Sequence, residues 1–311
     1  MAGQTSYTTT GIREDLVDKL IRIGDGEAMF LSNLQKRSTV PAMNKLHEWQ
    51  DWTLPAPTAN AAVEGFTPAT ASGNLGRTRR SNYVQIFSRT FQIADSVLEG
   101  IDIAGIKTEY QFQADANFTA LRRDIEWAFM KNVAASAGTS AAAATLAGCF
   151  NVISTNVAVP ATGTGLAMAE VDVLGMFQKI FTQRGVFFNL DIHAAPVDVA
   201  RIMAFTGPGT AGKFLMVSET TTVHNRQVSV IVTNFGKAAV IPNNIVATTA
   251  TAAGKILFAD MQTWALAVKV PPKLKALAKT TDSTAAYWKT ELTLEYLNES
   301  ANGQISAMAT S

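Results

Sequence analysis

Apolar residues recur along the chain at two spacings, and the clearest helical spacing spans residues 106–133. Its apolar side chains fall at intervals of three and four residues, which places them on one face of a helix. This face consists of Ile106, Tyr110, Ala114, Phe118, Leu121, Ile125, Ala128 and Phe129. At a rise of about 1.5 Å per residue the helix is about 40 Å long, which is typical of a domain spine.

We expect the core of this spine helix to be formed by Tyr110, Phe118, Leu121, Ile125 and Phe129. Charged residues fall largely off the apolar face. Among them, Arg122 and Glu126 are four residues apart, a spacing at which opposite charges can pair on a helix surface.

Two stretches with strand-like alternation flank a long connection. The first, 46–54, contains Trp49 and Trp52, and the second, 79–93, is rich in β-branched and aromatic residues. Together they predict a long hairpin. The connection, roughly 55–78, is rich in proline and glycine. Because connections this long are uncommon inside compact domains, it indicates a functional loop or a loop that folds against another chain.

The remaining sequence alternates between helical and strand patterns. Residues 12–23 have helical spacing, and residues 166–258 read as a compact α/β unit. In that unit the predicted helices are 169–185 and 196–205, and the predicted strands are 186–194, 227–236 and 237–244. The last stretch contains an apolar piece at 263–270 followed by Pro271-Pro272, and alternation predicts further strands at 287–298 and 304–310.

The composition narrows the class of protein. Charged residues make up 16% of the 311 residues, which is low against about 25% in typical soluble domains. Such a surface suits a protein that is largely covered by partners. The 26 basic and 25 acidic side chains give a net charge of +1, without the basic excess of a dedicated nucleic-acid binder.

Other broad classes find no support in the sequence. Cys149 is the single cysteine, which excludes an intrachain disulfide and gives no sign of a cysteine zinc cluster. The first residues lack the basic and apolar regions of a secretory signal. The sequence has no apolar run of about 18 residues, so we expect no membrane span.

A glycine-rich stretch at 207–213, GPGTAGK, matches the first seven positions of a phosphate-binding loop. The eighth position is Phe214, which cannot supply the hydroxyl that coordinates Mg²⁺. The pattern also predicts a helix before the stretch and a short strand after it, the reverse of a phosphate-binding loop. We therefore expect a flexible loop.

Other candidate groups do not form a catalytic or metal site. His47, Glu48 and Asp51 resemble a helical zinc motif, but the second histidine is missing and the context predicts a strand. Glu291 and Glu295 alternate on one strand face, and we interpret them as a solvated or intersubunit face rather than an acid pair. Cys149 lies among apolar residues and is expected to be buried. We predict no catalytic residue, cofactor or metal.

The order of these parts and several short stretches resemble the major capsid proteins of tailed bacteriophages. This fold is shared with herpesvirus capsid floors and with encapsulin shells. The matching stretches are DLVDKLIRIGDGEAMFLSNL, HEWQDWTL, NAAVEG, RDIEWAFM and TELTLEYLN. The resemblance covers about residues 12 to 310, and the alanine-rich stretch 137–147 departs from it, as expected of a variable surface loop.

The resemblance implies an α+β capsid fold made of five parts. These are an N-terminal arm (1–45), an extended hairpin called the E-loop (46–94), a peripheral P-domain with the spine helix (95–165), an axial A-domain (166–258) and returning P-domain strands (259–311). It also implies that the hairpin contacts neighbouring subunits. The candidate contact residues are Glu48, Trp49, Trp52, Glu64, Arg77, Arg79 and Arg80.

The implied function is structural. The chain would assemble with itself into hexamers and pentamers of an icosahedral head that encloses double-stranded DNA through weak, non-specific contacts. Portal, scaffold or decoration proteins are expected partners, and the expected location is the virion, after assembly in the host cytoplasm. Two alternatives stay open: an encapsulin-type compartment, and a nucleotide-binding enzyme that uses residues 207–213.

Overall fold

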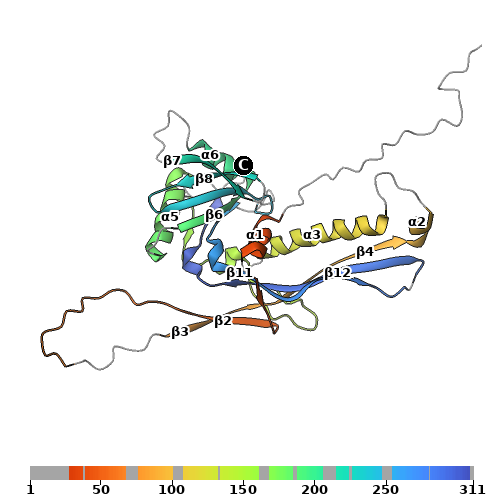
Figure 1. Ribbon diagram of the computed structural model, residues 1–311, viewed down its shortest axis with the longest axis horizontal. Helices are drawn as coiled ribbons and strands as arrows, with labels where there is room; N and C mark the ends of the chain where they lie inside the picture. Colours follow the sequence, from red (N-terminus) through yellow and green to blue (C-terminus); the bar gives the residue numbers. More distant parts are fainter. Residues whose placement is uncertain are drawn as a thin grey trace, which may run out of the picture.

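The protein is described by a computed structural model with three recognisable parts (Figure 1): an elongated layer, a compact α/β unit and a projecting hairpin. The described residues are 28–37, 39–67, 76–100, 108–131, 134–160, 168–184, 188–205, 215–223, 226–246, 254–279 and 281–308. The helix predicted at 12–23 and the glycine-rich stretch 207–213 lie outside them. None of the described helices is both long and apolar enough to cross a bilayer.

The elongated layer is a four-stranded sheet with one long helix lying along it (Figure 1). The sheet has the order β1-β11-β12-β4, and the helix is α3 (Glu109–Lys131). The strands are β1 (Thr39–Pro41), β11 (Trp264–Ala276), β12 (Ser283–Tyr296) and β4 (Gln85–Ala94). A short helix, α2 (Asp95–Gly100), follows β4.

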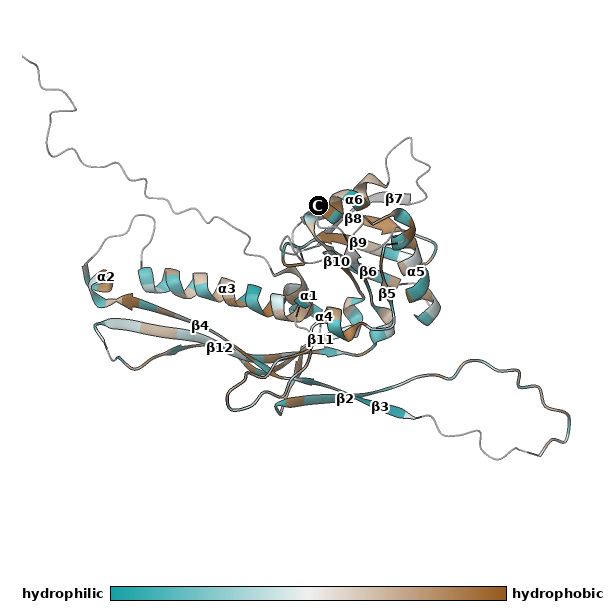
Figure 2. Ribbon diagram, turned by 180° about the vertical axis from the view of Figure 1, so that it is seen from behind, coloured by the Kyte–Doolittle hydropathy of each residue, from teal (hydrophilic) through white to brown (hydrophobic). Residues whose placement is uncertain are grey.

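The described part of the spine helix confirms the predicted face. Leu121, Ile125 and Phe129 are buried against β4, β11 and β12, whereas Tyr110 and Phe118 are half-buried. Tyr110 still packs on Phe91 and Phe118 on Trp288, with ring centroids 5.4 and 4.8 Å apart. Figure 2 shows hydrophobic and hydrophilic residues alternating along α3, as expected of a helix that covers one face of a sheet.

Glu126 corrects the interpretation of the polar side of this helix. It is fully buried, and its carboxylate accepts hydrogen bonds from Asn243 Nδ2 at 2.6 Å and from the Leu31 amide at 3.4 Å. Arg122 instead donates to Ser32 Oγ at 2.6 Å. The contacts of Leu31 and Ser32 arise because helix α1 (Met29–Arg37) crosses this end of the spine, whereas Asn243 directly follows the strand Gly236–Pro242.

Helix α1 also joins the elongated layer to the compact unit. Phe30 packs edge-on against both His193 and Trp264, with ring centroids 5.5 and 6.2 Å apart. Asn33 Nδ2 donates to Asp191 Oδ2 at 2.5 Å. This junction was not predicted from the sequence.

The compact unit is built on a seven-stranded sheet in the order β5-β13-β10-β6-β9-β8-β7. The strands are β5 (Val157–Ala158), β6 (Phe188–Ala194), β7 (Leu215–Val223), β8 (Arg226–Val232), β9 (Gly236–Pro242), β10 (Gly254–Ala259) and β13 (Gly303–Met308). Helices α5 (Glu170–Arg184) and α6 (Pro196–Ala204) flank it. Its core is separate from that of the spine and includes Phe177, Phe188 and Phe258.

Two strand predictions need correction. The second hairpin arm, predicted over 79–93, is divided at buried Val84, and only its first half pairs within the hairpin. Its second half is β4, which pairs with β12 in the spine sheet. The last strand, β13, was grouped with the returning strands, but it pairs with β10 in the compact unit.

Strand β11 runs through Pro271-Pro272 without ending there. The prolines lie where the register with β12 shifts, between Val270 and Lys273. On the other side, β1 pairs only with Leu266–Val268. Because proline lacks an amide donor, a bulged stretch at the edge of a sheet is a position that tolerates it.

Candidate intersubunit surface

The hairpin consists of β2 (Leu46–Trp52) and β3 (Arg77–Tyr83), which form a two-stranded sheet of their own. The pairing runs without a shift from Leu46 opposite Tyr83 to Trp52 opposite Arg77. Strand β2 confirms the predicted first arm. In Figure 1 the hairpin projects from the elongated layer, and the described part of its connection, 53–67, extends past the end of β2.

The base of the hairpin is attached to the end of β12. Trp49 Nε1 donates to the Tyr296 carbonyl at 2.8 Å, and the two rings meet edge to face with centroids 4.9 Å apart. His47 Nε2 lies 2.9 Å from Glu295 Oε2. These contacts fix the direction in which the hairpin leaves its own subunit.

Glu291 and Glu295 are both buried and both have partners within the chain, which corrects their interpretation as a solvated or intersubunit face. Glu295 pairs with His47, whereas Glu291 contacts Lys289 at 2.8 Å and Lys269 at 2.9 Å. The hydrogen bonds from these lysines, that from Lys289 first, lower the pKa of Glu291. The base of the hairpin covers Glu295 through His47, whereas the side chains of Lys269 and Lys289 lie against Glu291.

Two ion pairs cross the hairpin diagonally. Arg79 Nη2 lies 2.8 Å from Glu48 Oε2, and Arg80 Nε lies 3.0 Å from Asp51 Oδ2. The hydrogen bond to Asp51 raises the pKa of Arg80. The sequence predicted that Glu48 and these arginines contact adjacent subunits, but in the isolated chain they hold the two strands together. Exposed pairs of this kind contribute about 0–1 kcal/mol each.

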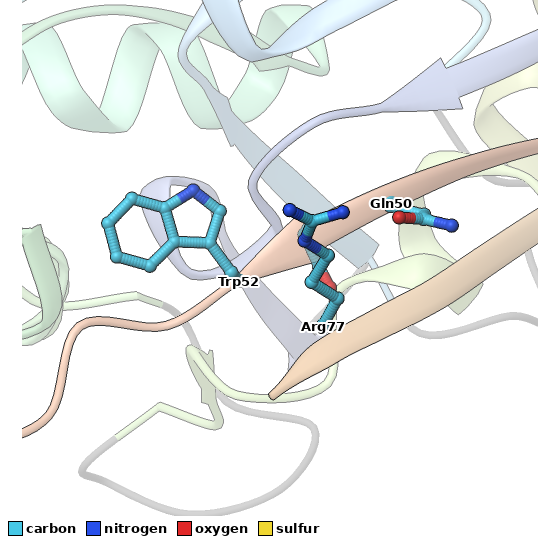
Figure 3. A pocket seen from close by; sticks show the side chains of 4 residues that line it. Gln50, Trp52 and Arg77 are labelled. Carbon is cyan, nitrogen blue, oxygen red and sulfur yellow. The ribbon is translucent and has the colours of Figure 1, made fainter. Parts of the chain in front are cut away.

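A hollow of about 440 Å³ lies where the paired strands end, lined by Gln50, Asp51, Trp52 and Arg77. The Trp52 side chain is 59% exposed. Arg77 is also exposed, and it has no hydrogen-bond or ion-pair partner among the described residues. In Figure 3 its side chain rises between those of Trp52 and Gln50. An uncovered indole next to an unpaired guanidinium can receive a group that is both apolar and acidic.

The described part of the connection, 53–67, is exposed along its whole length. It contains exposed apolar side chains: Leu54 at 72%, Val63 at 77% and Phe66 at 58%. A tight turn lies at its far end, where the Phe66 amide donates to the Val63 carbonyl at 3.1 Å. Gly65 adopts φ 77°, which the third position of a type II turn requires. This turn presents Glu64 and Phe66 together.

Candidate chemistry elsewhere in the described residues remains structural. No group of three or more His, Cys, Asp or Glu side chains there is placed to hold a metal ion. Cys149 is buried, as predicted, and burial raises the pKa of its thiol well above the usual range. Two residues that attach the hairpin to the end of β12, Tyr296 and Asn82, were not identified from the sequence. Asn82 is fully buried and donates to the Leu294 carbonyl at 2.8 Å, but its sequence context is that of an ordinary strand.

The comparisons with known proteins agree with this architecture. The family model for the SU10 major capsid protein matches residues 3–309, whereas no curated protein matches the chain. Similar solved structures include the capsid of the native GTA particle (TM-score 0.66, 11% identity, 98% of this chain and 98% of that chain). A structure from Mycobacterium phage Adephagia is comparable (TM-score 0.66, 11% identity, 100% and 99%).

The SrpI encapsulin complex from Synechococcus elongatus PCC 7942 also has this fold (TM-score 0.63, 10% identity, 97% and 94%). At such identities the structures show a shared fold, and the match of the family model carries the assignment. The chain belongs to the SU10 major capsid protein family and is a structural protein of a phage capsid.

Proposed function

We propose that this chain is the repeating tile of an icosahedral phage head, arranged in hexamers and pentamers around double-stranded DNA, with its hairpin lying across a neighbouring subunit. The hairpin connection carries this proposal. Leu54, Val63 and Phe66 are exposed there and have no core of their own. Covering a large apolar side chain fully is worth about 1.5–3 kcal/mol, so a neighbouring subunit that covers them would be stabilised in place.

The parts of the chain have separate roles in this proposal. The hairpin is the E-loop, α3 and the four-stranded sheet form the P-domain, the seven-stranded unit is the A-domain, and the residues before β2 are the N-terminal arm. Assembly takes place in the host cytoplasm, where portal, scaffold or decoration proteins act on the same shell.

Removing the connection is expected to abolish closed shells while leaving a folded subunit. Because Trp52 pairs directly with Arg77, residues 53–76 can be replaced by Asn-Gly, which closes a two-residue hairpin and keeps every pair between β2 and β3. Circular dichroism tests the folding of the subunit, and electron microscopy counts the particles.

A matched pair of point variants accompanies this deletion. Phe66→Ser is expected to reduce shell formation and Phe66→Leu to retain it, because leucine keeps most of the apolar area. Normal particles from the Asn-Gly variant would contradict the assignment of the E-loop.

Contact with DNA is expected to be weak and diffuse. With a net charge of +1, each tile neutralises few phosphates. About one phosphate contact per subunit gives a log–log salt slope near −1, against roughly −5 to −9 for a binder with 6–10 contacts. Binding of unassembled subunits to duplex DNA over a salt series measures this slope. A steep slope would show a dedicated nucleic-acid binder rather than a container.

The encapsulin alternative rests on the shared fold with the SrpI complex. The content of purified particles separates the two functions: nuclease-resistant duplex DNA supports the phage head, whereas a protein cargo without DNA supports the compartment. The nucleotide-binding alternative depends on residues 207–213, which lie outside the described residues, and no described feature favours it.

A further inference from the structure

The hairpin carries equal numbers of acidic side chains and arginines, and all but two of these six form ion pairs among the described residues. Residues 46–83 carry three acidic side chains and three arginines. Glu48 pairs with Arg79, and Asp51 pairs with Arg80. Glu64 and Arg77 have no partner among the described residues, and residues 68–75 contain no charged side chain.

These two residues lie in surroundings that complement each other. Glu64 lies in the turn at the far end of the connection, two residues from the exposed ring of Phe66. Arg77 lies in the hollow at the end of the paired strands, opposite the exposed indole of Trp52. Each surface therefore combines one aromatic ring with one unpaired charge, and the two charges are opposite.

The turn and the hollow of one chain lie apart. In Figure 1 the described part of the connection, 53–67, runs away from the end of β2, so the turn does not fold back onto its own hollow. A contact between two different surfaces of identical subunits is head-to-tail, and such contacts close into rings when the rotation between subunits allows it.

We propose that the turn Val63–Phe66 of one subunit docks into the Gln50–Asp51–Trp52–Arg77 hollow of a second copy, with Glu64 paired to Arg77 and Phe66 packed on Trp52. This inference rests on the proposed function, since it specifies which surface of the neighbour the hairpin meets. Trp52 and Arg77 lie directly opposite each other on β2 and β3. The Cβ atoms of such a pair are about 5 Å apart, a spacing that suits a turn that presents Glu64 and Phe66 two residues apart.

Charge reversal in the full-length chain tests this pairing. Glu64→Arg and Arg77→Glu are each expected to lower the yield of closed shells about tenfold or more, because each places like charges in a contact from which water is excluded. The double variant restores opposite charges and is expected to return the yield to within about twofold of the original, as a reciprocal charge pair predicts.

The matched control reverses a pair that is satisfied within the chain, Glu48→Arg with Arg79→Glu, and is expected to leave the yield unchanged. Normal shells from both single variants, failure of the double variant to restore them, or loss of shells in the control would each overturn the inference. The proposed function has its own test in the Asn-Gly replacement, so the two can fail separately.

A second measurement does not depend on altering the charges. Val63→Cys with Gln50→Cys places one thiol in the turn and one in the hollow. A short bismaleimide is expected to join these thiols between subunits of assembled shells, which gives a ladder of multimers on denaturing gels. Closed shells that yield only monomers would overturn the inference.

Discussion

Replacing Leu121 or Phe129 by alanine is expected to lower the free energy of unfolding of the unassembled subunit by about 2–5 kcal/mol. Leu121 is 1% exposed, and Phe129 is fully buried in the same cluster as Trp264, Leu292 and Leu294. Removing either side chain leaves a cavity between the spine helix and its sheet, which the surrounding side chains fill only in part. Urea unfolding monitored by circular dichroism measures the change.

Arg123→Ala is the matched control on the same helix. Arg123 is exposed and has no hydrogen-bond partner among the described residues, so the change is expected to stay within about 0.5 kcal/mol. Arg122 is a poorer control than Arg123, because it is half-buried and donates a hydrogen bond to Ser32. Equal tolerance at Leu121, Phe129 and Arg123 would contradict the helix register.

Asp191→Asn is expected to stabilise the subunit at neutral pH. Burial raises the pKa of Asp191 to about 6, while Arg37 and Asn33 act in the opposite direction and Asp260 adds to the increase. Because the folded state holds this proton more tightly than the unfolded state, the contribution of Asp191 to stability is largest below about pH 4 and is lost as pH rises to about 6. A pKa of about 6 in the folded state, against about 4 in the unfolded state, corresponds to about 3 kcal/mol of unfolding free energy, of which the asparagine variant recovers part.

The difference between the variant and the original protein isolates this group from other titrating residues. Unfolding free energies measured from pH 4.5 to 7.5 are expected to diverge as pH rises, with the variant more stable at the upper end. Asparagine can still accept the hydrogen bond from Asn33, so the junction with α1 is retained. A difference that is constant with pH, or that grows toward acid, would contradict the raised pKa.

The sequence was sufficient for elements whose burial depends on their own periodicity. Leu121, Ile125 and Phe129 could be placed on the spine face because three- and four-residue intervals define one side of a helix. Alternation likewise identified the strand that contains Phe87 and Phe91. The partner of that strand could not be identified from alternation, because β4 pairs with residues of β12 about 200 positions later in the chain.

Burial that depends on distant segments escaped prediction for the same reason. Glu126 has the helical position of a surface residue, and its burial results from α1 and Asn243, which come from either side of it in the chain. Glu295 has the alternation of a half-exposed strand, but the base of the hairpin covers it through His47. The hairpin charges could be proposed as contacts, whereas their division into two internal pairs and two unpaired residues required the cross-strand register.

The central claim is that the hairpin leaves its own subunit and lies across a neighbour in a closed shell. Electron cryomicroscopy of shells assembled from the full-length chain tests it most directly. The density is expected to show each 46–83 hairpin continuous with its own β12 at Trp49 and Tyr296, with its turn at Glu64 and Phe66 covered by a neighbouring subunit. Density in which the hairpin folds back onto its own subunit, or in which Phe66 stays exposed inside a closed shell, would contradict it.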